Sequence, residues 1–562
     1  MLTDIVKWKN YKDLDETLKK ELDSFTEEDY YEAFYTDLAF GTGGMRGILG
    51  PGTNRMNIYT MRRANYGYGQ YILQTKKANP SVVIAYDCRH NSRLFAEESA
   101  RVLATMGIKV LLFDKITPTP ELSFAVRELK ATGGIVITAS HNPPNYNGYK
   151  IYDDFGCQLV PDLADIVIDE IAKAPDAFQI DVESFASLKQ KGYIEIVDDS
   201  IDTAYLNKVK SIRVHPDLNK ENFLVVFTPL HGTSSLLGQR LLQETGYPCI
   251  PVVEQMVADP NFSTVSSPNP ENKEAFDLAI AYAKKHHADI CIATDPDADR
   301  MGIAVYHQGN YVLLTGNQTG AILIQYLAKY RTLKKKGVLF NTIVTSPLGA
   351  AIARKYHLDV ISTLTGFKYI GEQAKLLENT EREFFFGYEE SYGYVVSDFV
   401  RDKDSLQALL LCSEVACYYK NQGKTLVDVL EEIYQEYGYY HDHLINITLT
   451  GASGAQKIEE ILNYFHNEKQ SNFQGLKIVA KEDYLLQQRF ENNQTTKLAL
   501  PKANVIKYFL DDGSWFVLRP SGTEPKMKVY ISVVTNSRHD SILRSKEIEQ
   551  KVMELINHIK GE

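Results

Sequence analysis

The 562-residue chain lacks the features that mark secreted and membrane proteins. Cysteines are few and no two form a CxxC pair, so neither a zinc site nor a disulfide framework is indicated. They are Cys88, Cys157, Cys249, Cys291, Cys412 and Cys417. No run of about eighteen apolar residues is present, so no membrane-spanning helix is predicted. The first residues are polar and charged, so we expect no signal peptide and a cytoplasmic location.

An excess of positive charge is also missing. The formal net charge is −11, which argues against nucleic acid as the main partner. A small anionic substrate stays compatible with this charge, because a local basic cleft can occur on an acidic protein. Hydrophobic residues make up 44% and charged residues 24% of the chain, as in an ordinary globular enzyme.

The chain contains no complete nucleotide-binding loop. The segment Gly423-Lys424-Thr425 has the end of a P-loop, but Tyr418 stands where its first glycine is required. The glycine-rich segment 41–47 (GTGGMRG) matches neither the P-loop nor the dinucleotide fingerprint, and alone it is compatible with a plain turn. ATP is therefore not a predicted ligand.

Three segments share one pattern, in which an apolar strand is followed by a polar loop and then a helical stretch. The strands fall at 82–86, 223–227 and 338–340. Continuous apolar strands flanked by helices predict sheets that are covered on both faces. We therefore expect three tandem α/β domains with mixed sheets, preceded by an amphipathic helical extension over the first forty residues.

The last quarter of the chain has a different pattern. An alternating strand over 443–450, with a hinge at 438–442 before it, predicts a sheet with one open face. Further expected elements are a helix over 455–465, strands at 515–518 and 529–533, and a terminal helix over 541–559. These elements predict a C-terminal α+β domain. The expected domain boundaries are 1–208, 209–320, 321–438 and 439–562.

Ser140 follows the buried-strand run 134–137, in the segment Thr-Ala-Ser-His-Asn-Pro. Pro143 and Pro144 forbid a helix directly after it, so its hydroxyl is expected on a loop at a strand end, where α/β proteins place ligands. A serine in that position can carry a phosphoryl group.

Three carboxylates, Asp295, Asp297 and Asp299, alternate between two apolar stretches. A solvated turn is the plain alternative, but three like charges this close repel one another unless a cation binds. An EF-hand is excluded, because Arg300 stands where that loop needs glycine and Tyr306 where it needs glutamate. Carboxylates together with a phosphate oxygen suit Mg²⁺.

Two further loops carry ligand-binding side chains. The segment 387–393 (GYEESYG) offers carboxylates and hydroxyls for sugar hydroxyls, although an acidic surface turn would look the same. The segment 519–526 (RPSGTEPK) combines a guanidinium, two hydroxyls and a glycine that lets backbone N–H groups approach an anion. The second segment favours phosphate binding over a structural turn.

These four loops occur together and in order, and over its whole length the sequence resembles the α-D-phosphohexomutase superfamily. The N-terminal extension with its GTGGMRG segment resembles the longer branch, which includes phosphoglucomutases and phosphopentomutases. The resemblance implies three α/β domains and a C-terminal α+β domain around one central cleft.

The resemblance also implies roles for individual residues. Ser140 would carry the phosphoryl group, with Lys150, Arg46 and His141 assisting proton and phosphoryl movement. A phosphoserine oxygen of Ser140 would complete the Mg²⁺ site of Asp295, Asp297 and Asp299. Substrate would be bound by Arg300, Thr365, Gly366, Glu389, Ser391, Lys403, Arg519, Ser521, Gly522 and Thr523.

The implied reaction is the reversible conversion of glucose 1-phosphate to glucose 6-phosphate, with glucose 1,6-bisphosphate as intermediate and activator. Tyr388 and Tyr392 depart from many relatives, which leaves the sugar open, so phosphopentomutase and phosphomannomutase remain alternatives. An inactive sugar-phosphate binding protein and a phosphatase are further alternatives. The implied partner is a phosphosugar, with no nucleic acid, membrane or ATP, and the oligomeric state stays open.

Overall fold

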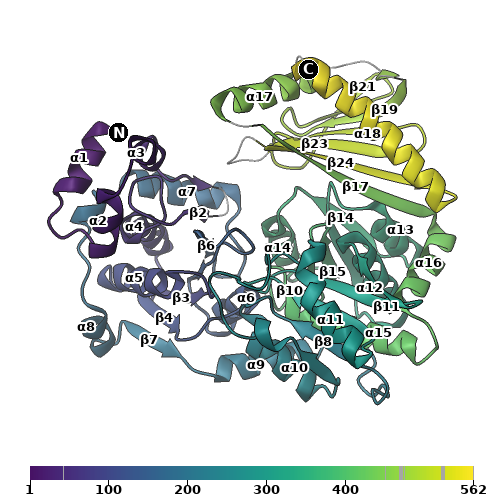
Figure 1. Ribbon diagram of the computed structural model, residues 1–562, viewed down its shortest axis with the longest axis horizontal. Helices are drawn as coiled ribbons and strands as arrows, with labels where there is room; N and C mark the ends of the chain where they lie inside the picture. The colour runs from purple at the N-terminus through teal and green to yellow at the C-terminus, as the bar shows by residue number, and fades with distance from the viewer. Residues whose placement is uncertain (42–43, 450, 468–471, 474, 521–525, 561–562) are drawn as a thin grey trace. The chain divides into compact units, whose positions relative to one another are not determined.

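The structure is a computed structural model that describes the chain except residues 42–43, 450, 468–471, 474, 521–525 and 561–562 (Figure 1). Its residues form two compact units. The first contains Met1–Gly316, Thr332–Gly337 and Phe367–Thr425, and the second contains Asn317–Arg331, Val338–Gly366 and Leu426–Glu562. Among the described residues, none of the helices combines the length and the apolar character needed to cross a bilayer.

The first unit begins with the predicted helical extension. Its helices are α1 (Leu2–Asn10), α2 (Glu16–Asp23) and α3 (Glu27–Phe34). Asp15 caps α2, and Thr26 forms a capping box with Asp29 at the start of α3, which is why these two short helices start where they do. Trp8 and Phe34 bury the apolar sides of these helices in a cluster of their own.

A seven-stranded mixed sheet follows, in the order β1-β2-β6-β5-β3-β4-β7. The strands are β1 (Phe40–Gly41), β2 (Gly44–Ile48), β3 (Ser81–Tyr86), β4 (Lys109–Phe113), β5 (Gly133–Ile137), β6 (Tyr146–Tyr152) and β7 (Ile194–Val197). The helices are α4 (Ile58–Gln74), α5 (Ser92–Thr105), α6 (Thr119–Glu128), α7 (Pro161–Ala172), η1 (Ala177–Gln179) and α8 (Phe185–Gln190). Residues of α4 and α5 share a core with Val82 and Ile84, whereas Leu122 of α6 contacts Gly134. Because neighbouring positions on a strand face opposite ways, helices cover both faces of this sheet, as expected.

A second mixed sheet of the first unit has the order β12-β11-β10-β8-β9. Its strands are β8 (Val225–Thr228), β9 (Cys249–Pro251), β10 (Ile290–Thr294), β11 (Met301–His307) and β12 (Asn310–Leu314). The helices in this region are α9 (Ser200–Lys210), α10 (Ser234–Glu244), η2 (Val253–Gln255), η3 (Lys273–Phe276) and α11 (Asp277–His286). β8, β9 and β10 are parallel, and β10 turns back antiparallel into β11, so the loop between β10 and β11 is a tight hairpin.

The third α/β region is shared between the two units. It contains β13 (Lys336–Thr342), β14 (Asp359–Thr363), β15 (Arg382–Glu389) and β16 (Gly393–Val395), with α12 (Gly316–Tyr330), α13 (Pro347–Lys355), α14 (Phe367–Leu376) and α15 (Ser405–Lys420). In the second unit β13 pairs parallel with β14, and in the first unit β15 pairs antiparallel with β16. The β15–β16 hairpin carries the sugar loop that the sequence singles out.

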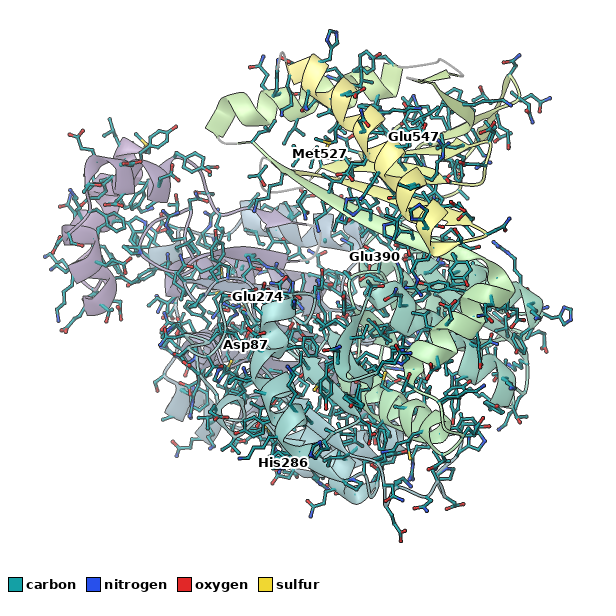
Figure 2. All side chains as sticks on the ribbon, turned by 45° about the vertical axis from the view of Figure 1, so that its right-hand side comes forward. Asp87, Glu274, His286, Glu390, Met527 and Glu547 are labelled. Carbon is teal, nitrogen blue, oxygen red and sulfur yellow. The ribbon has the colours of Figure 1, made fainter. Side chains whose placement is uncertain are left out.

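The second unit ends in an α+β domain, as predicted. Its sheet has the order β17-β24-β23-β22-β19-β20-β21, with β18 paired to β19. The strands are β17 (Tyr439–Thr448), β18 (Asn472–Phe473), β19 (Leu476–Asp483), β20 (Gln488–Glu491), β21 (Gln494–Lys497), β22 (Ile506–Leu510), β23 (Trp515–Pro520) and β24 (Lys526–Thr535), and the helices are α16 (Leu426–Tyr437), α17 (Gly451–Asn467) and α18 (Arg538–Lys560). The long α18 packs along β17 and β24 (Figure 1). Met527 of β24 is buried in this core, whereas Glu547 lies on the exposed side of α18 (Figure 2).

The hinge expected at 438–442 is wrong. Tyr439 starts β17 and pairs with Thr535, and the pairing with β24 continues without a gap to Thr448. Tyrosine fits a half-buried strand well, and here the ladder overrides the turn that Gly438 suggests. Gly438 itself has φ +99°, so the bend is confined to one residue before the strand.

Candidate active site

Ser140 lies on the loop between β5 and β6, where the sequence places it. Its side chain is only 4% exposed, and its N–H donates to Thr138 Oγ1 at 2.8 Å. Its hydroxyl donates to Asp295 Oδ2 at 2.7 Å and lies 3.1 Å from His141 Nδ1. The loop therefore brings a buried hydroxyl directly against the carboxylate loop 155 positions further along the chain.

Three of the loops that carry predicted site residues each hold a non-glycine residue in the left-handed region. They are Ser140 (φ +51°), Ala298 (φ +58°) and Tyr392 (φ +65°). Such a conformation costs about 1 kcal/mol or more for a residue with a Cβ, so surrounding contacts must hold it. Strain of this kind is common where loops position reacting groups.

The hairpin between β10 and β11 gathers three buried carboxylates. Asp295 Oδ1 accepts the N–H groups of Asp299 at 3.0 Å and Arg300 at 2.9 Å, which fixes the turn. One carboxylate oxygen from each of Asp295, Asp297 and Asp299 lies within 4.8 Å of the others, and all three side chains are buried. Three converging carboxylates of this kind form a site for a hard cation.

Two buried lysines neutralise part of this charge. Lys150, on β6, donates from Nζ to Asp297 Oδ2 at 2.8 Å and to Asp299 Oδ2 at 3.1 Å. Lys403 Nζ lies 3.0 Å from the same Asp299 oxygen. Burial lowers the pKa of each ammonium, but the adjacent carboxylates outweigh it and raise both pKa values, so both lysines are charged.

The three carboxyl groups differ in their affinity for a proton. Burial and the charges of Asp297 and Asp299 raise the pKa of Asp295 well above its ordinary value. Burial also acts to raise the pKa of Asp297, but Lys150 outweighs it and the pKa is lowered. For Asp299, burial and the charge of Asp297 are outweighed by Lys403 and Lys150, and the pKa is lowered as well. Asp295, which contacts the Ser140 hydroxyl, is therefore the most basic carboxylate of the three.

The donor set fits a divalent metal ion. Among the described residues, Asp297 Oδ1 and Asp299 Oδ1 are buried oxygens without a hydrogen-bond partner, although Arg300 Nε lies 3.8 Å from the latter. Buried carboxylate oxygens that no N–H or O–H satisfies are costly unless a cation takes them. All the donors at this site are carboxylate oxygens, and oxygen ligands are the ones that Mg²⁺ prefers.

Arg300 joins the carboxylate loop to the sugar loop. Its guanidinium donates to Glu271, and the next residue, Met301, donates its N–H to the carbonyl of Tyr392 at 3.0 Å. Burial acts to lower the pKa of Arg300, but the charges of Glu271 and the aspartates outweigh this effect and the pKa is raised. The guanidinium is therefore a fixed cation. Glu389 also contributes to this shift, which places its charge near the same cluster.

Two other residues predicted for the site lie beside the Ser140 loop. Arg46, on β2, donates from Nη1 to Asn142 Oδ1 at 2.8 Å. The pKa of His141 is lowered well below its ordinary value by burial and by the nearby Arg300 and Arg46 guanidinium groups. His141 is therefore a neutral imidazole next to the Ser140 hydroxyl.

The sugar loop lies between β15 and β16. Glu389 ends β15 and is buried, and Ser391 is half-buried in the turn that follows. Tyr388 is fully buried, with its ring 5.9 Å from that of Phe386, so this departure from relatives lies in the core. Tyr392 occupies the left-handed position of the turn.

The remaining predicted residues belong to the second unit. Thr365 is half-buried in the turn after β14, and the next residue, Gly366, has φ +120°, a conformation suited to glycine. Arg519 lies near the end of β23, with Nη1 3.4 Å from the hydroxyl of Tyr530. Ser521, Gly522 and Thr523 lie outside the described residues.

Sequence reasoning missed several residues that hold this cluster together. Thr119, at the start of α6, donates its N–H to the Asp297 carbonyl at 2.9 Å and its hydroxyl to Asp297 Oδ2 at 3.1 Å. Asp402 accepts the hydroxyl of Tyr152 at 2.7 Å and the ammonium of Lys403 at 3.2 Å. Arg89 supports the Ser140 loop. Only Asp402 could have been found from a local feature of the sequence, because it is next to the predicted Lys403. Thr119 and Arg89 act through contacts between segments that are far apart in the sequence.

Four domain models of one family match the chain in succession. They are the phosphoglucomutase/phosphomannomutase α/β/α domains I, II and III, at residues 37–177, 203–309 and 315–437, and the C-terminal domain, at residues 444–543. Together they account for most of the sequence, including every loop described above.

Relatives of this family are similar over almost the full length. The chain is 41% identical over 506 residues to a phosphoglucomutase of Staphylococcus aureus strain MRSA252, which covers 89% of this chain and 90% of the relative. It is 39% identical over 559 residues to a phosphoglucomutase of Staphylococcus haemolyticus, covering 99% of each. The crystal structure of parafusin, a phosphoglucomutase from Paramecium, has the same fold, with a TM-score of 0.70 at 18% identity over 94% of this chain and 96% of that one. The chain belongs to the phosphoglucomutase/phosphomannomutase family.

Proposed function

We propose that the chain is a mutase that interconverts α-D-glucose 1-phosphate and glucose 6-phosphate through a phosphorylated Ser140 and glucose 1,6-bisphosphate. The observation that carries the proposal is the contact between Ser140 Oγ and Asp295 Oδ2 at 2.7 Å, inside a buried cluster of carboxylates and lysines. The names of relatives at 39–41% identity support glucose as the sugar.

In the first half of the reaction the phosphoryl group leaves Ser140 Oγ for the free hydroxyl of glucose 1-phosphate. The bond from phosphorus to Oγ breaks and a bond to the sugar oxygen forms. The sugar hydroxyl gives up its proton, and the serine oxygen takes one up. His141 Nδ1, a neutral imidazole nitrogen 3.1 Å from Oγ, and Lys150 are the groups to which we assign this exchange.

In the second half the other phosphate of the bisphosphate returns to Ser140, which restores the phosphoserine and releases glucose 6-phosphate. Positive charge stabilises each transfer, and Lys150, Lys403 and Arg300 supply it from fixed positions. Glucose 1,6-bisphosphate is accordingly also the activator that loads an unphosphorylated chain. ATP has no part in this cycle.

We assign the metal site to Asp295, Asp297, Asp299 and a phosphoserine oxygen on Ser140, with Mg²⁺ as the ion. When bound, the ion supplies Lewis-acid stabilisation of charge on the phosphoryl oxygens. Glu389 and Ser391 would bind sugar hydroxyls, and Thr365 and Gly366 would support substrate binding. Arg519 with Ser521, Gly522 and Thr523 would hold the phosphate that is not transferred.

The four-segment division at 208/209, 320/321 and 438/439 is part of the same proposal, as is a cytoplasmic location. Each segment would supply one of the four loops. The partner is a phosphosugar; we propose no role for nucleic acid or a membrane.

Ser140→Ala tests the proposal. We expect turnover to fall by at least about 10³-fold, because the phosphoryl carrier is removed while no cavity is made in the core. On treatment with glucose 1,6-bisphosphate, the intact mass of the wild-type protein should increase by one phosphoryl group, whereas the mass of the variant should not change. Ser200→Ala, at an exposed serine, is the matched control. Turnover by Ser140→Ala near the wild-type rate would contradict the mechanism.

A mannose or pentose mutase is the second candidate, since the family model that matches includes phosphomannomutases. Rates on glucose, mannose and ribose 1-phosphates, measured side by side, separate the three sugars. We expect the highest kcat/KM for glucose. A higher value for ribose or mannose would replace the sugar in the proposal and leave the phosphoserine mechanism in place.

A further inference from the structure

All the side-chain N–H groups of Arg89 donate hydrogen bonds to the loop that carries Ser140. Its Nε and Nη2 donate to the Ser140 carbonyl at 3.1 and 2.5 Å, and Nη2 also donates to the carbonyl of Asn142. Its Nη1 donates to the carbonyls of Pro143 at 2.8 Å and Tyr146 at 3.0 Å. A guanidinium has five N–H groups, so every one of them is used on four carbonyls of a single loop.

The guanidinium is itself held on its other sides. Asp87, which directly follows β3 and is labelled in Figure 2, fixes the backbone here: it accepts the backbone N–H of Arg89 at 2.9 Å and the hydroxyl of Ser92 at 2.6 Å. A second Asp87 oxygen lies 3.5 Å from Arg89 Nε, and the ring of Phe262 lies 5.0 Å from the guanidinium carbon. Arg89 is 4% exposed, so the group is buried and rigidly placed.

The loop needs such a support from outside. Pro143 and Pro144 have no N–H to donate, and Ser140 is in the left-handed region, which a serine does not adopt without support. A carbonyl that accepts two N–H groups cannot rotate freely, and rotation about the Ser140 backbone would carry Oγ away from Asp295. The bonds from Arg89 therefore oppose the motion that would misplace the hydroxyl.

We propose that Arg89 is a positioning residue for phosphoryl transfer, which gathers the carbonyls of residues 140–146 so that Ser140 Oγ stays directed at Asp295. The inference rests on the proposed mutase function. Arg89 acts through the loop backbone, with no contact to the transferred group required of it. Lysine could not replace it, since an ammonium has three donors and no planar fork.

The test compares Arg89→Lys and Arg89→Met with the wild type and with Arg93→Met, a matched change at a mostly exposed arginine four positions away. Four quantities are measured: kcat and KM for glucose 1-phosphate, the single-turnover rate of Ser140 phosphorylation by glucose 1,6-bisphosphate, Mn²⁺ affinity by calorimetry, and rescue of Arg89→Met by added guanidinium ion. Circular dichroism shows whether each variant is folded.

For Arg89→Met we expect kcat and the single-turnover rate to fall together by about 100-fold, as for a reacting group displaced by about 1 Å. KM and Mn²⁺ affinity should stay near wild-type values, and guanidinium ion should restore part of the rate. Arg89→Lys should fold, and its kcat should lie between those of the wild type and Arg89→Met. It keeps the test valid if the methionine variant does not fold.

Two results would overturn the inference. One is wild-type kcat in both Arg89 variants. The other is a folded variant in which kcat and Mn²⁺ affinity fall and KM rises together, with no rescue by guanidinium ion. That pattern would indicate a general structural role for Arg89. A wild-type protein that does not turn over glucose 1-phosphate at all contradicts the proposed function instead, so the two failures are distinct.

Discussion

At the scale of single residues, the site is organised by charge in a buried volume. Three aspartates would repel one another if they stood alone, yet Lys150 and Lys403 bond to two of them and leave the third, Asp295, for the Ser140 hydroxyl. Removal of one partner from such a cluster leaves a buried charge unpaired, which is strongly unfavourable. The cluster is therefore sensitive to any change of charge.

Asp297→Asn is expected to weaken binding of Mg²⁺ or Mn²⁺ by at least about tenfold, because it removes one formal charge from a hard-cation site. Calorimetric titration of metal into the protein, after treatment with EDTA, measures this directly. EDTA should also inactivate the wild type, and Mg²⁺ should restore its activity. Asp277→Asn, an exposed aspartate at the start of α11, is the control. Equal metal affinity in Asp297→Asn and wild type would refute the assignment.

The residues with local signatures could be predicted from the sequence, and those defined by distant contacts could not. Ser140 and the three aspartates stand in loops whose composition already suggests their chemistry. Thr119 and Arg89 do not, because their roles depend on which segments fold against one another. The structure places Thr119 against Asp297 across 178 positions and Arg89 against Ser140 across 51. No periodicity or motif in one sequence reports such pairs.

At the scale of secondary-structure elements, α6 and α9 bring two carboxyl groups together away from the metal loop. Glu121 of α6 is fully buried beside Asp202 of α9, which accepts Lys115 Nζ at 2.6 Å. Burial, and then the charge of Asp202, raises the pKa of Glu121 well above its ordinary value. Among the described residues, neither Glu121 oxygen nor Asp202 Oδ1 has a hydrogen-bond partner, and a proton held by Glu121 toward Asp202 would satisfy Asp202 Oδ1 and one of the two Glu121 oxygens.

Glu121→Gln should make the protein more stable at higher pH. In the unfolded chain Glu121 releases its proton near its ordinary pKa of 4.5, whereas the folded protein retains it to higher pH. The stability is thus fully present below that value and is lost as the pH rises toward the folded pKa. Between about pH 5 and about pH 8, the free energy of unfolding of the variant should therefore increase relative to that of the wild type, because the variant has no carboxyl group that must stay protonated in the folded protein.

Urea denaturation at both pH values measures the difference. Glu128→Gln, at the exposed end of the same helix, controls for the loss of a charge on α6. A difference between Glu121→Gln and wild type that does not change with pH would show that the Glu121 carboxyl is ionised in the folded protein.

The elements themselves follow closely from the sequence pattern. The apolar runs at 82–86 and 338–340 lie within β3 and β13, and the helix expected over 455–465 lies within the longer α17. The sequence pattern does not predict β6, because Tyr146–Tyr152 contains glycine, asparagine and lysine. This segment forms a strand because β2 and β5 pair with it on its two sides. The mistaken hinge at 438–442 has the same cause, since β24 decides where β17 begins.

At the scale of the whole molecule, the residues predicted for the site do not all belong to the same compact unit. Ser140, the carboxylates and Lys403 belong to the first, and Arg519 belongs to the second. The four-domain division stays a prediction, because the compact units do not coincide with it.

Arg519→Ala should raise KM by an amount equivalent to about 2–3 kcal/mol, the value of a charge-assisted bidentate contact. The anchored phosphate is present in substrate, intermediate and product, so all three should bind more weakly. The variant should also release glucose 1,6-bisphosphate during turnover and require more of it for full activity. Steady-state kinetics across bisphosphate concentrations, with direct assay of released bisphosphate, measure both effects. Unchanged KM and no added bisphosphate requirement would place the phosphate anchor elsewhere.

The two tryptophans of the chain provide a natural pair of fluorescent reporters. Trp8 is buried in the helical extension of the first unit, with its ring 5.4 Å from that of Tyr59, and Trp515 is buried in the second unit, 4.0 Å below the ammonium of Lys507. Replacing either one with phenylalanine leaves a protein whose tryptophan emission, excited selectively at the red edge of the absorption band, comes from a single unit. Denaturation curves of the two single-tryptophan proteins then show, without any attached label, whether the units unfold in one transition or in two.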